Sequence, residues 1–428
     1  MMNRRYVQVL VSAFVALGVS VAQGATLTVG PGGKYDYSII QSAIDAAGNG
    51  DEILVAPGTY TGSGSTPVVN TRGKAIHVHS AYGQDVTIID GQGSRQCLRI
   101  NKGESSSTII EGFAIRNGHV PGGENSGGGG AQIYWSSPIV RGCRFESNHS
   151  FGWEWYGSNG GAAHIRGGAP TFEQCEFYNN STDGNGGALY LSDACVVTLN
   201  AVEVYNNSAL KGGGVYLTGQ STAIFTDSML NSNDAQYYGG AVYLVNFSSL
   251  QIETSTVDDN SAGYMGGGIY DQCASFQVSG TQFRSNWAGN NGGGIAVNCG
   301  DGVVQSCSFE WNDADGSSGP AIYIEQIGTL VLGGSSICGS GQDPIDGEYI
   351  DKGGNGIHGS CSLGACCTNN ICVMLDMETC SLVGGVHQGL DTDCLVEGCP
   401  ETCFDVNGDG QVGVDEILYV IEHFGVCP

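Results

Sequence analysis

The feature that most constrains this chain is an internal repeat in its middle, with a period of about 26 residues. In each copy an apolar residue is followed three positions later by asparagine. The pairs are Phe145/Asn148, Phe177/Asn180, Val204/Asn207, Leu230/Asn233, Val257/Asn260, Phe283/Asn286 and Phe309/Asn312. A unit this short cannot bury its own apolar face, so successive copies must stack on one another.

A second mark recurs in step with the first: a corner of small residues that leads into alternating apolar residues. Its copies are Gly186–Leu191, Gly212–Leu217, Gly239–Leu244, Gly266–Asp271, Gly292–Val297 and Gly319–Ile324. Alternation with period two is typical of β-strands, and the region shows no helical periodicity. Stacked coils about 4.8 Å apart would place equivalent residues above one another. The sequence therefore predicts an all-β solenoid.

The alternation predicts two columns of inward-pointing side chains. They are Ala163, Leu189, Val215, Val242, Ile269, Ile295 and Ile322, and Ile165, Leu191, Leu217, Leu244, Asp271, Val297 and Ile324. We expect the one charged member, Asp271, at a rim or a hydrated gap. The recurring asparagine is expected to form a ladder of stacked amides, because its side chain both donates and accepts hydrogen bonds.

The paired marks resemble the repeats of polymorphic outer membrane proteins, within the pectate-lyase-like class of right-handed parallel β-helices. The resemblance covers about residues 143 to 325. Upstream, Ile39–Ala47 followed by Gly50–Tyr60 resembles the entry segment of such β-helices, which implies a short amphipathic helix that caps the open end of the cylinder. The resemblance and the repeat together predict a right-handed parallel β-helix over residues 25–345.

The N-terminus predicts export. Arg4 and Arg5 precede an apolar run from Val7 to Val21, and small residues follow at Ala22-Gln23-Gly24, so residues 1–24 are predicted to be a signal peptide. The run is shorter than the roughly 20 residues that cross a bilayer. We expect a secreted protein, extracellular or at the cell surface, without a membrane span.

The distribution of cysteines indicates a separate C-terminal segment, and the net charge limits the class of partner. Of 17 cysteines, nine lie between Cys361 and Cys427, which predicts a disulfide-rich segment at 346–402. The number is odd, so at least one thiol is free or pairs with another chain. The formal charge of −27 argues against nucleic acid as a partner.

Residues 403–428 contain a calcium-loop pattern. The expected ligands are Asp405, Asn407, Asp409, Gln411 and Glu416, with glycine at position 6 of the loop, so Ca²⁺ is the predicted cofactor. The loop and the helix expected after it resemble half of a dockerin, which implies a scaffold protein as a possible partner. Only one of a dockerin's two copies is present, and a disulfide between Cys403 and Cys427 is one way to close it.

No catalytic residue is predicted. Arg284 is the only basic residue between Lys211 and Lys352, and it falls between Asp258 and Glu310 on adjacent coils, where an ion pair explains it. The eight histidines are dispersed and show no metal-ligand spacing. A polysaccharide lyase or glycoside hydrolase of the pectate-lyase-like class, delivered by the dockerin-like tail, stays the alternative function.

The favoured function rests on a column of outward-pointing tyrosines. Its members are Tyr190, Tyr216, Tyr243, Tyr270 and Tyr323, with His164 and Ala296 in the same column. One interpretation is a flat strip for adhesion, binding an extracellular polysaccharide or a cell-surface partner. The other is cross-strand stacking that only stabilises the sheet, by about 0.2 to 1 kcal/mol per pair.

Overall fold

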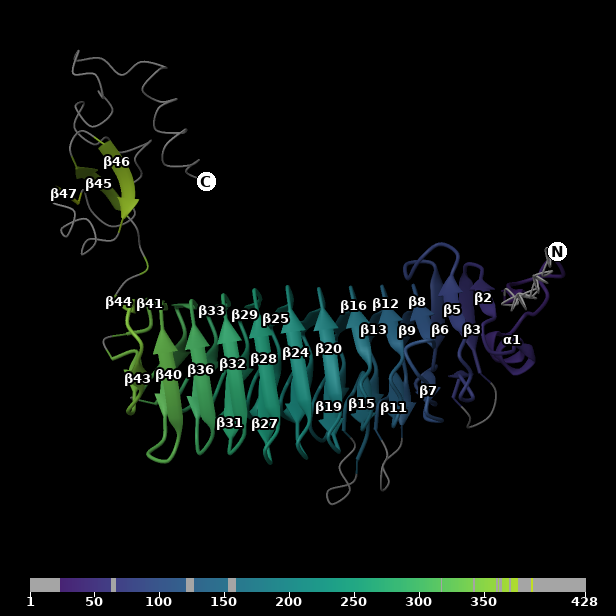
Figure 1. The fold of residues 1–428 in the computed structure, drawn as a ribbon, viewed down its shortest axis with the longest axis horizontal. Coiled ribbons are helices and arrows are strands. Elements are labelled where there is room, and N and C mark those ends of the chain that lie inside the picture. The colour runs from purple at the N-terminus through teal and green to yellow at the C-terminus, as the bar shows by residue number, and fades with distance from the viewer. Residues whose placement is uncertain are drawn as a thin grey trace, which may run out of the picture.

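The computed structural model describes residues 24–62, 67–120, 127–152, 159–316, 318–341, 343–358 and 361. Beyond these it describes the backbone of three strands: β45 (Gly364–Thr368), β46 (Ile371–Leu375) and β47 (Val386–His387). The body is a parallel β-helix, in which flat coils lie side by side along one long axis (Figure 1). The all-β solenoid predicted from the repeat is confirmed.

Four parallel sheets form the walls of the cylinder, and each coil contributes one strand to most of them. The 13-stranded A sheet consists of β1 (Thr26–Val29), β2 (Glu52–Val55), β5 (His77–Ser80), β8 (Ile109–Glu111), β12 (Ile139–Arg141), β16 (Thr171–Glu173), β20 (Val196–Asn200), β24 (Thr222–Thr226), β28 (Ser249–Glu253), β32 (Ser275–Ser279), β36 (Asp301–Gln305), β40 (Thr329–Gly333) and β43 (Ile350–Asp351). The 12-stranded B sheet consists of β3 (Gly58–Thr61), β6 (Thr87–Asp90), β9 (Ala114–Arg116), β13 (Arg144–Glu146), β17 (Glu176–Tyr178), β21 (Glu203–Tyr205), β25 (Met229–Asn231), β29 (Thr256–Asp258), β33 (Gln282–Arg284), β37 (Ser308–Glu310), β41 (Ser336–Cys338) and β44 (Gly356–His358).

The 11-stranded C sheet carries the predicted tyrosine column. It consists of β4 (Val69–Asn70), β7 (Leu98–Ile100), β11 (Ala131–Tyr134), β15 (Ala163–Arg166), β19 (Leu189–Ser192), β23 (Val215–Leu217), β27 (Val242–Val245), β31 (Ile269–Gln272), β35 (Ile295–Val297), β39 (Ile322–Ile324) and β42 (Ile345–Asp346). The eight-stranded D sheet follows the B sheet in the coils from β9 to β37 and consists of β10 (His119–Val120), β14 (His149–Ser150), β18 (Ser181–Thr182), β22 (Ser208–Lys211), β26 (Asp234–Tyr238), β30 (Ser261–Ala262), β34 (Trp287–Ala288) and β38 (Asp313–Ala314).

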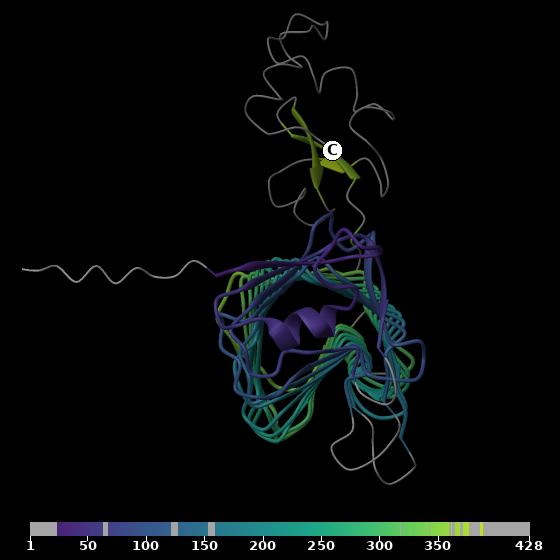
Figure 2. The same ribbon diagram turned by 90° about the vertical axis from the view of Figure 1, so that its right-hand side faces the viewer.

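The helix expected in the entry segment is α1 (Ile40–Ala46), and it lies across the mouth of the cylinder (Figure 2). Its apolar side chains Ile40, Ala43 and Ile44 are buried against the first coil. Lys74 donates hydrogen bonds from Nζ to the carbonyl oxygens of Ile44, Asp45 and Ala47, at 2.6 to 2.9 Å. A cation at this end satisfies orphan carbonyls and complements the helix dipole.

The predicted register is confirmed. In the B sheet Phe145 pairs with Phe177, which pairs with Val204, and the series continues in step to Phe309. Both predicted inward columns are buried along their length. The rim expected as one setting for Asp271 is wrong, because the residue lies fully buried in its column, between Leu244 and Val297.

The asparagine ladder is also confirmed. The side chain of each asparagine from Asn148 to Asn286 donates to Oδ1 of the next, at 2.9 to 3.0 Å, and all seven asparagines are buried. The residue before each one has φ between 52° and 56°, which makes the tight turn between the B and D strands; these residues are Ser147, Asn179, Asn206, Ser232, Asp259, Ser285 and Trp311. Asn, Asp and Ser are common in such left-handed turns.

The glycine corner before each C strand is tightly packed. Gly239 has φ +65°, and a Cβ there would lie 2.4 Å from the carbonyl oxygen of Val242. A Cβ on Gly240 would lie 2.2 Å from the carbonyl oxygen of Gly267 on the next coil. Small residues recur at this corner because the coils approach backbone to backbone.

The cysteines of the body serve two purposes. Cys273 pairs with Cys299 on adjacent coils, and Cys338 pairs with Cys361. Cys97, Cys143, Cys175, Cys195 and Cys307 are buried free thiols, and burial raises the pKa of each. Most cysteines of the body are therefore core side chains. The cysteine content alone had favoured disulfides instead. No helix in the described part of the chain is long and apolar enough to cross a bilayer.

Candidate functional site

The predicted tyrosine column runs along the outer face of the C sheet, one residue per coil. Tyr190, Tyr216, Tyr243 and Tyr270 are in register, Ala296 follows, and Tyr323 comes one coil later. Ring centroids of successive tyrosines are 4.9 to 5.3 Å apart, with interplanar angles of 9° to 20°. The rings therefore turn their faces toward one another along the stack, and not toward solvent.

The middle of the column is covered. The side chains of Tyr243 and Tyr270 are only 2% and 4% exposed, and they form a small apolar cluster outside the main core. Tyr238, from the end of β26, packs over both, with ring centroids 6.2 Å and 4.7 Å away. Of the two interpretations weighed from the sequence, a flat strip and cross-strand stacking, the structure shows the stack, which is partly open at Tyr190, Tyr216 and Tyr323.

Two exposed tyrosines lie beside this stack, on adjacent coils. Tyr237 lies in β26 of the D sheet, and Tyr264 lies between β30 and β31; they are 45% and 44% exposed. The backbone N–H of Tyr264 donates to the carbonyl oxygen of Tyr237 at 2.8 Å. The Tyr264 ring contacts the Tyr238 ring edge to face, with centroids 5.3 Å apart. Tyr238 in turn packs on the buried stack. We call Tyr237, Tyr238 and Tyr264, together with the five predicted tyrosines, the tyrosine face.

Sequence reasoning missed Tyr237, Tyr238 and Tyr264 because they lie outside the two repeat marks. A signal was present: Tyr237 and Tyr264 both stand two residues before the first glycine of the corner, at Gly239 and Gly266. Because the corner repeats once per coil, residues at equal distance from it lie on neighbouring coils. Pairing of Tyr238 with Met265 in the structure follows the same rule.

The polar groups of the tyrosine face are held within it. The Tyr243 hydroxyl donates to Oε1 of Gln272, and Asn298 donates from Nδ2 to the Tyr270 hydroxyl at 3.1 Å. Burial raises the pKa of Tyr243, and it raises the pKa of Tyr270 to about 12. These hydroxyls are neutral in any ordinary buffer and present no charge to a ligand.

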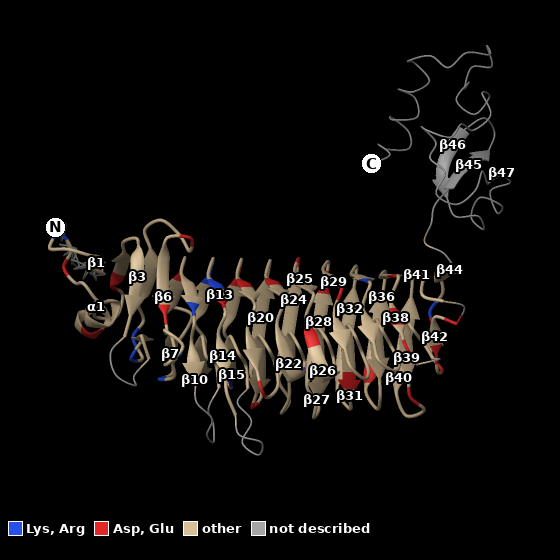
Figure 3. Ribbon diagram, turned by 180° about the vertical axis from the view of Figure 1, so that it is seen from behind, with Lys and Arg blue, Asp and Glu red and all other residues tan. Residues whose placement is uncertain are grey.

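One cation lies on the tyrosine face. Nζ of Lys211 is 5.5 Å from the ring centroid of Tyr243 and 5.6 Å from that of Tyr238, within range of a cation–π contact. Among the described residues, Lys211 forms no ion pair. Basic residues are otherwise concentrated on the N-terminal coils, whereas the later coils are acidic (Figure 3).

Arg284, the basic residue weighed for catalysis, forms an ion pair. Its Nη2 lies 3.4 Å from Oδ2 of Asp258, on the neighbouring strand of the B sheet, as the spacing predicted. The predicted calcium ligands Asp405, Asn407, Asp409, Gln411 and Glu416 lie outside the described residues, as do residues 1–23.

The comparison with protein families decides the class of this fold. The model of the right-handed β-helix region matches residues 74–308, more than half of the 428 residues. The chain belongs to the right-handed β-helix family. No curated protein sequence matches the chain.

Solved β-helix structures resemble this member of the family in fold. Pectate lyase Pel9A aligns at 13% identity with a TM-score of 0.46, covering 78% of this chain and 80% of that chain. Pectin methylesterase from carrot aligns at 10% identity and a TM-score of 0.30, covering 79% and 89%. The A-module of mannuronan C-5 epimerase AlgE6 from Azotobacter vinelandii aligns at 13% identity and a TM-score of 0.30, covering 74% and 94%.

Proposed function

We propose that this protein is a secreted or surface-associated β-helix that binds an extracellular polysaccharide or a cell-surface partner through its tyrosine face. The observation that carries the proposal is the arrangement of Tyr237 and Tyr264. They are half-exposed on adjacent coils, and both rings contact Tyr238, which packs on the buried stack. Stacking within the sheet does not require exposed rings above the stack.

Rigid support favours binding. Tyr238 packs against Tyr243, Tyr270 and Tyr264, so the aromatic segment is held by ring contacts on several sides. Rings that are already fixed lose little conformational freedom when a ligand covers them. Tyrosine also offers an apolar ring and a hydroxyl together, which suits the mixed polarity of a sugar or of a protein surface.

The chain ends belong to the same proposal. A signal peptide at residues 1–24 would direct the β-helix out of the cell, where the predicted disulfides form. The loop at 405–416 would bind Ca²⁺ and stabilise the C-terminal module. Likeness to half of a dockerin supports an anchoring role, with a scaffold protein as the partner, and likeness to polymorphic outer membrane protein repeats supports a cell-surface setting.

The test is retention of the protein on a panel of insoluble and immobilised polysaccharides and on intact cells, with calcium present. Changing both Tyr237→Ala and Tyr264→Ala is expected to weaken binding at least tenfold, equivalent to about 1.4 kcal/mol. The two side chains are half-exposed, so the fold should be preserved, which circular dichroism would check.

The matched control is Tyr82→Ala, since Tyr82 is 76% exposed on an early coil far along the sequence from the tyrosine face. Its binding should equal that of the unaltered protein. Equal retention of the double variant and the control would refute the proposal. Release of new reducing ends or unsaturated products from the same panel would favour the enzymatic alternative.

A further inference from the structure

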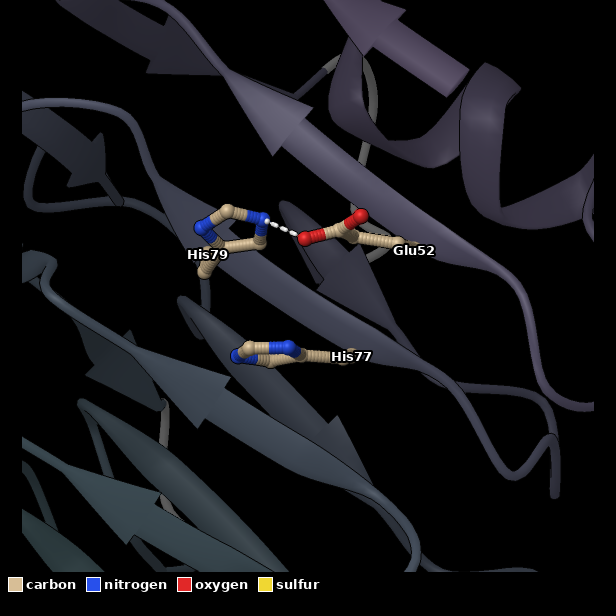
Figure 4. Close-up of side chains that lie close together, drawn as sticks. All are labelled: Glu52, His77 and His79. Carbon is tan, nitrogen blue, oxygen red and sulfur yellow. Dashed lines mark ion pairs between the residues drawn. The ribbon is translucent and has the colours of Figure 1, made fainter. Parts of the chain in front are cut away.

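A second group of chemically distinctive side chains lies on the A sheet, at the opposite end of the sequence from the predicted calcium loop. Glu52 stands in β2, and His77 and His79 stand in β5, the neighbouring strand (Figure 4). Residues two apart on a strand share a face, so both imidazoles point outward beside Glu52. The prediction that the histidines show no metal-ligand spacing missed this pair, whose members are two residues apart on one strand.

The three side chains converge. One ligand atom from each lies within 4.8 Å of the other two, and all three residues are partly exposed. In the part of the chain that the structure describes, this is the one such group of three or more. Nε2 of His79 lies 2.7 Å from Oε1 of Glu52, yet this nitrogen lacks a partner in hydrogen-bond geometry. The ion pair already brings two potential ligands together, with His77 beside them (Figure 4).

Neighbouring residues hold the group in place. Thr26 donates a hydrogen bond from Oγ1 to Oε2 of Glu52 at 3.0 Å, and Oε2 of Glu111 lies 3.0 Å from Nε2 of His77. The rings of His77 and His79 are stacked, with centroids 4.5 Å apart. Metal-bound histidines commonly give their second ring nitrogen to a carboxylate, which fixes the ring, and Glu111 is placed for that role.

We propose that Glu52, His77 and His79 bind a divalent transition-metal ion of the zinc class. Two imidazoles and one carboxylate are ligands that Zn²⁺ accepts in sites with three protein ligands, whereas Ca²⁺ prefers oxygen alone. The fourth position faces solvent and takes water or a ligand group. The ion links β2 to β5 in the A sheet, near the N-terminal end of the cylinder.

The experiment is titration of the untagged, chelator-treated full chain with Zn²⁺ by calorimetry, in excess Ca²⁺ so that the predicted tail loop is filled. The variant His77→Gln/His79→Gln is expected to bind one equivalent of Zn²⁺ fewer than the unaltered chain. The single change Glu111→Gln is expected to weaken that equivalent 10- to 100-fold, as loss of an orienting carboxylate usually does. Zn²⁺ is also expected to raise the thermal midpoint of the unaltered chain but not of the double variant.

The matched control is His119→Gln/His149→Gln. These two histidines are also stacked on adjacent coils, with ring centroids 6.0 Å apart, but they lie on the D sheet outside the proposed site. Their loss should leave the titration unchanged, and Zn²⁺ bound by tail cysteines would be common to all variants. Equal stoichiometry and affinity in the unaltered chain and the His77/His79 variant would overturn the proposal, and so would the absence of any Zn²⁺ binding.

Discussion

At the scale of single residues, Asp271 shows how a buried carboxyl departs from its repeat. It occupies a position that is apolar in the neighbouring coils, and its Oδ1 accepts one hydrogen bond, from the backbone N–H of Ala274 at 2.9 Å. Oδ2 has no partner in the described structure. A Cβ on Gly300 would lie 1.7 Å from Oδ2, so the adjacent coil admits only glycine there. Burial raises the pKa of Asp271 to about 7.

This pKa predicts a pH dependence of stability. The folded pKa is above the unfolded value of about 3.9, so between these pH values the folded chain keeps a proton that the unfolded chain releases. Stability from this group is therefore fully present at acid pH and falls as pH rises toward 7. Between pH 5 and pH 8 the loss should be about 3 kcal/mol.

The matched variant is Asp271→Asn, which keeps the shape and cannot ionise. Urea unfolding of both proteins at pH 5 and pH 8 would measure the effect. The stability of the variant relative to the unaltered chain should rise by about 3 kcal/mol over this range. A relative stability that is the same at both pH values would show that Asp271 does not titrate as described.

Residue patterns predicted the positions of the outward tyrosines but not that Tyr238 buries two of them. The repeat marks recur in every coil, so the positions of Tyr190, Tyr216, Tyr243 and Tyr270 followed from spacing alone. Tyr238, which buries two of them, lies in a segment whose sequence differs from coil to coil. Burial by a neighbouring segment depends on that local sequence, so spacing alone left both an open strip and a stack possible for the tyrosine column.

At the scale of structural elements, the asparagine ladder holds the turns between the B and D sheets. Oδ1 of Asn207 accepts from both the backbone N–H and Nδ2 of Asn180, at 3.0 Å each. Its own Nδ2 donates to the carbonyl oxygen of Phe177 at 2.8 Å and to Oδ1 of Asn233 at 2.9 Å. One amide thus serves three successive coils.

Replacing this amide should be costly. In Asn207→Ala two buried donors of Asn180 lose their acceptor, which predicts a loss of about 3 kcal/mol in the free energy of unfolding. Urea denaturation followed by circular dichroism would measure it. Asn200→Ala is the control, because Asn200 is exposed at the end of β20, and it should change stability by less than about 0.5 kcal/mol. Equal stability of the two variants would mean that the ladder is not a source of stability.

Elements with irregular spacing were the harder ones to predict. Glu52, His77 and Ile109 are paired in turn across β2, β5 and β8, but the step in sequence from His77 to Ile109 is longer than the step from Glu52 to His77. Because these sequence intervals are unequal, the early coils have no fixed period, and their strands could not be aligned with one another from the sequence. Glu52 and His79 lie diagonally across two neighbouring strands. Predicting their contact required the strand register, which the sequence alone did not provide.

At the scale of the whole molecule, a long cylinder with unlike faces accounts for the proposed roles. The A sheet carries the histidine–glutamate group at its N-terminal end, and the C sheet carries the tyrosine face further along. Both depend on equivalent residues lying one coil apart. The regular repeat in the middle of the chain predicted that arrangement because each coil packs against its neighbours in the same way.

The most direct test of this architecture is cross-linking between coils. Thr226 and Glu253 are paired in adjacent A-sheet strands, whereas Thr226 and Ser279 are two coils apart, about 9.6 Å at the usual strand spacing. A disulfide requires Cα atoms within about 7 Å. Peptide mapping by mass spectrometry should find the cross-link in Thr226→Cys/Glu253→Cys and not in Thr226→Cys/Ser279→Cys. Cross-linking of the second pair alone, or of neither, would contradict one coil per repeat.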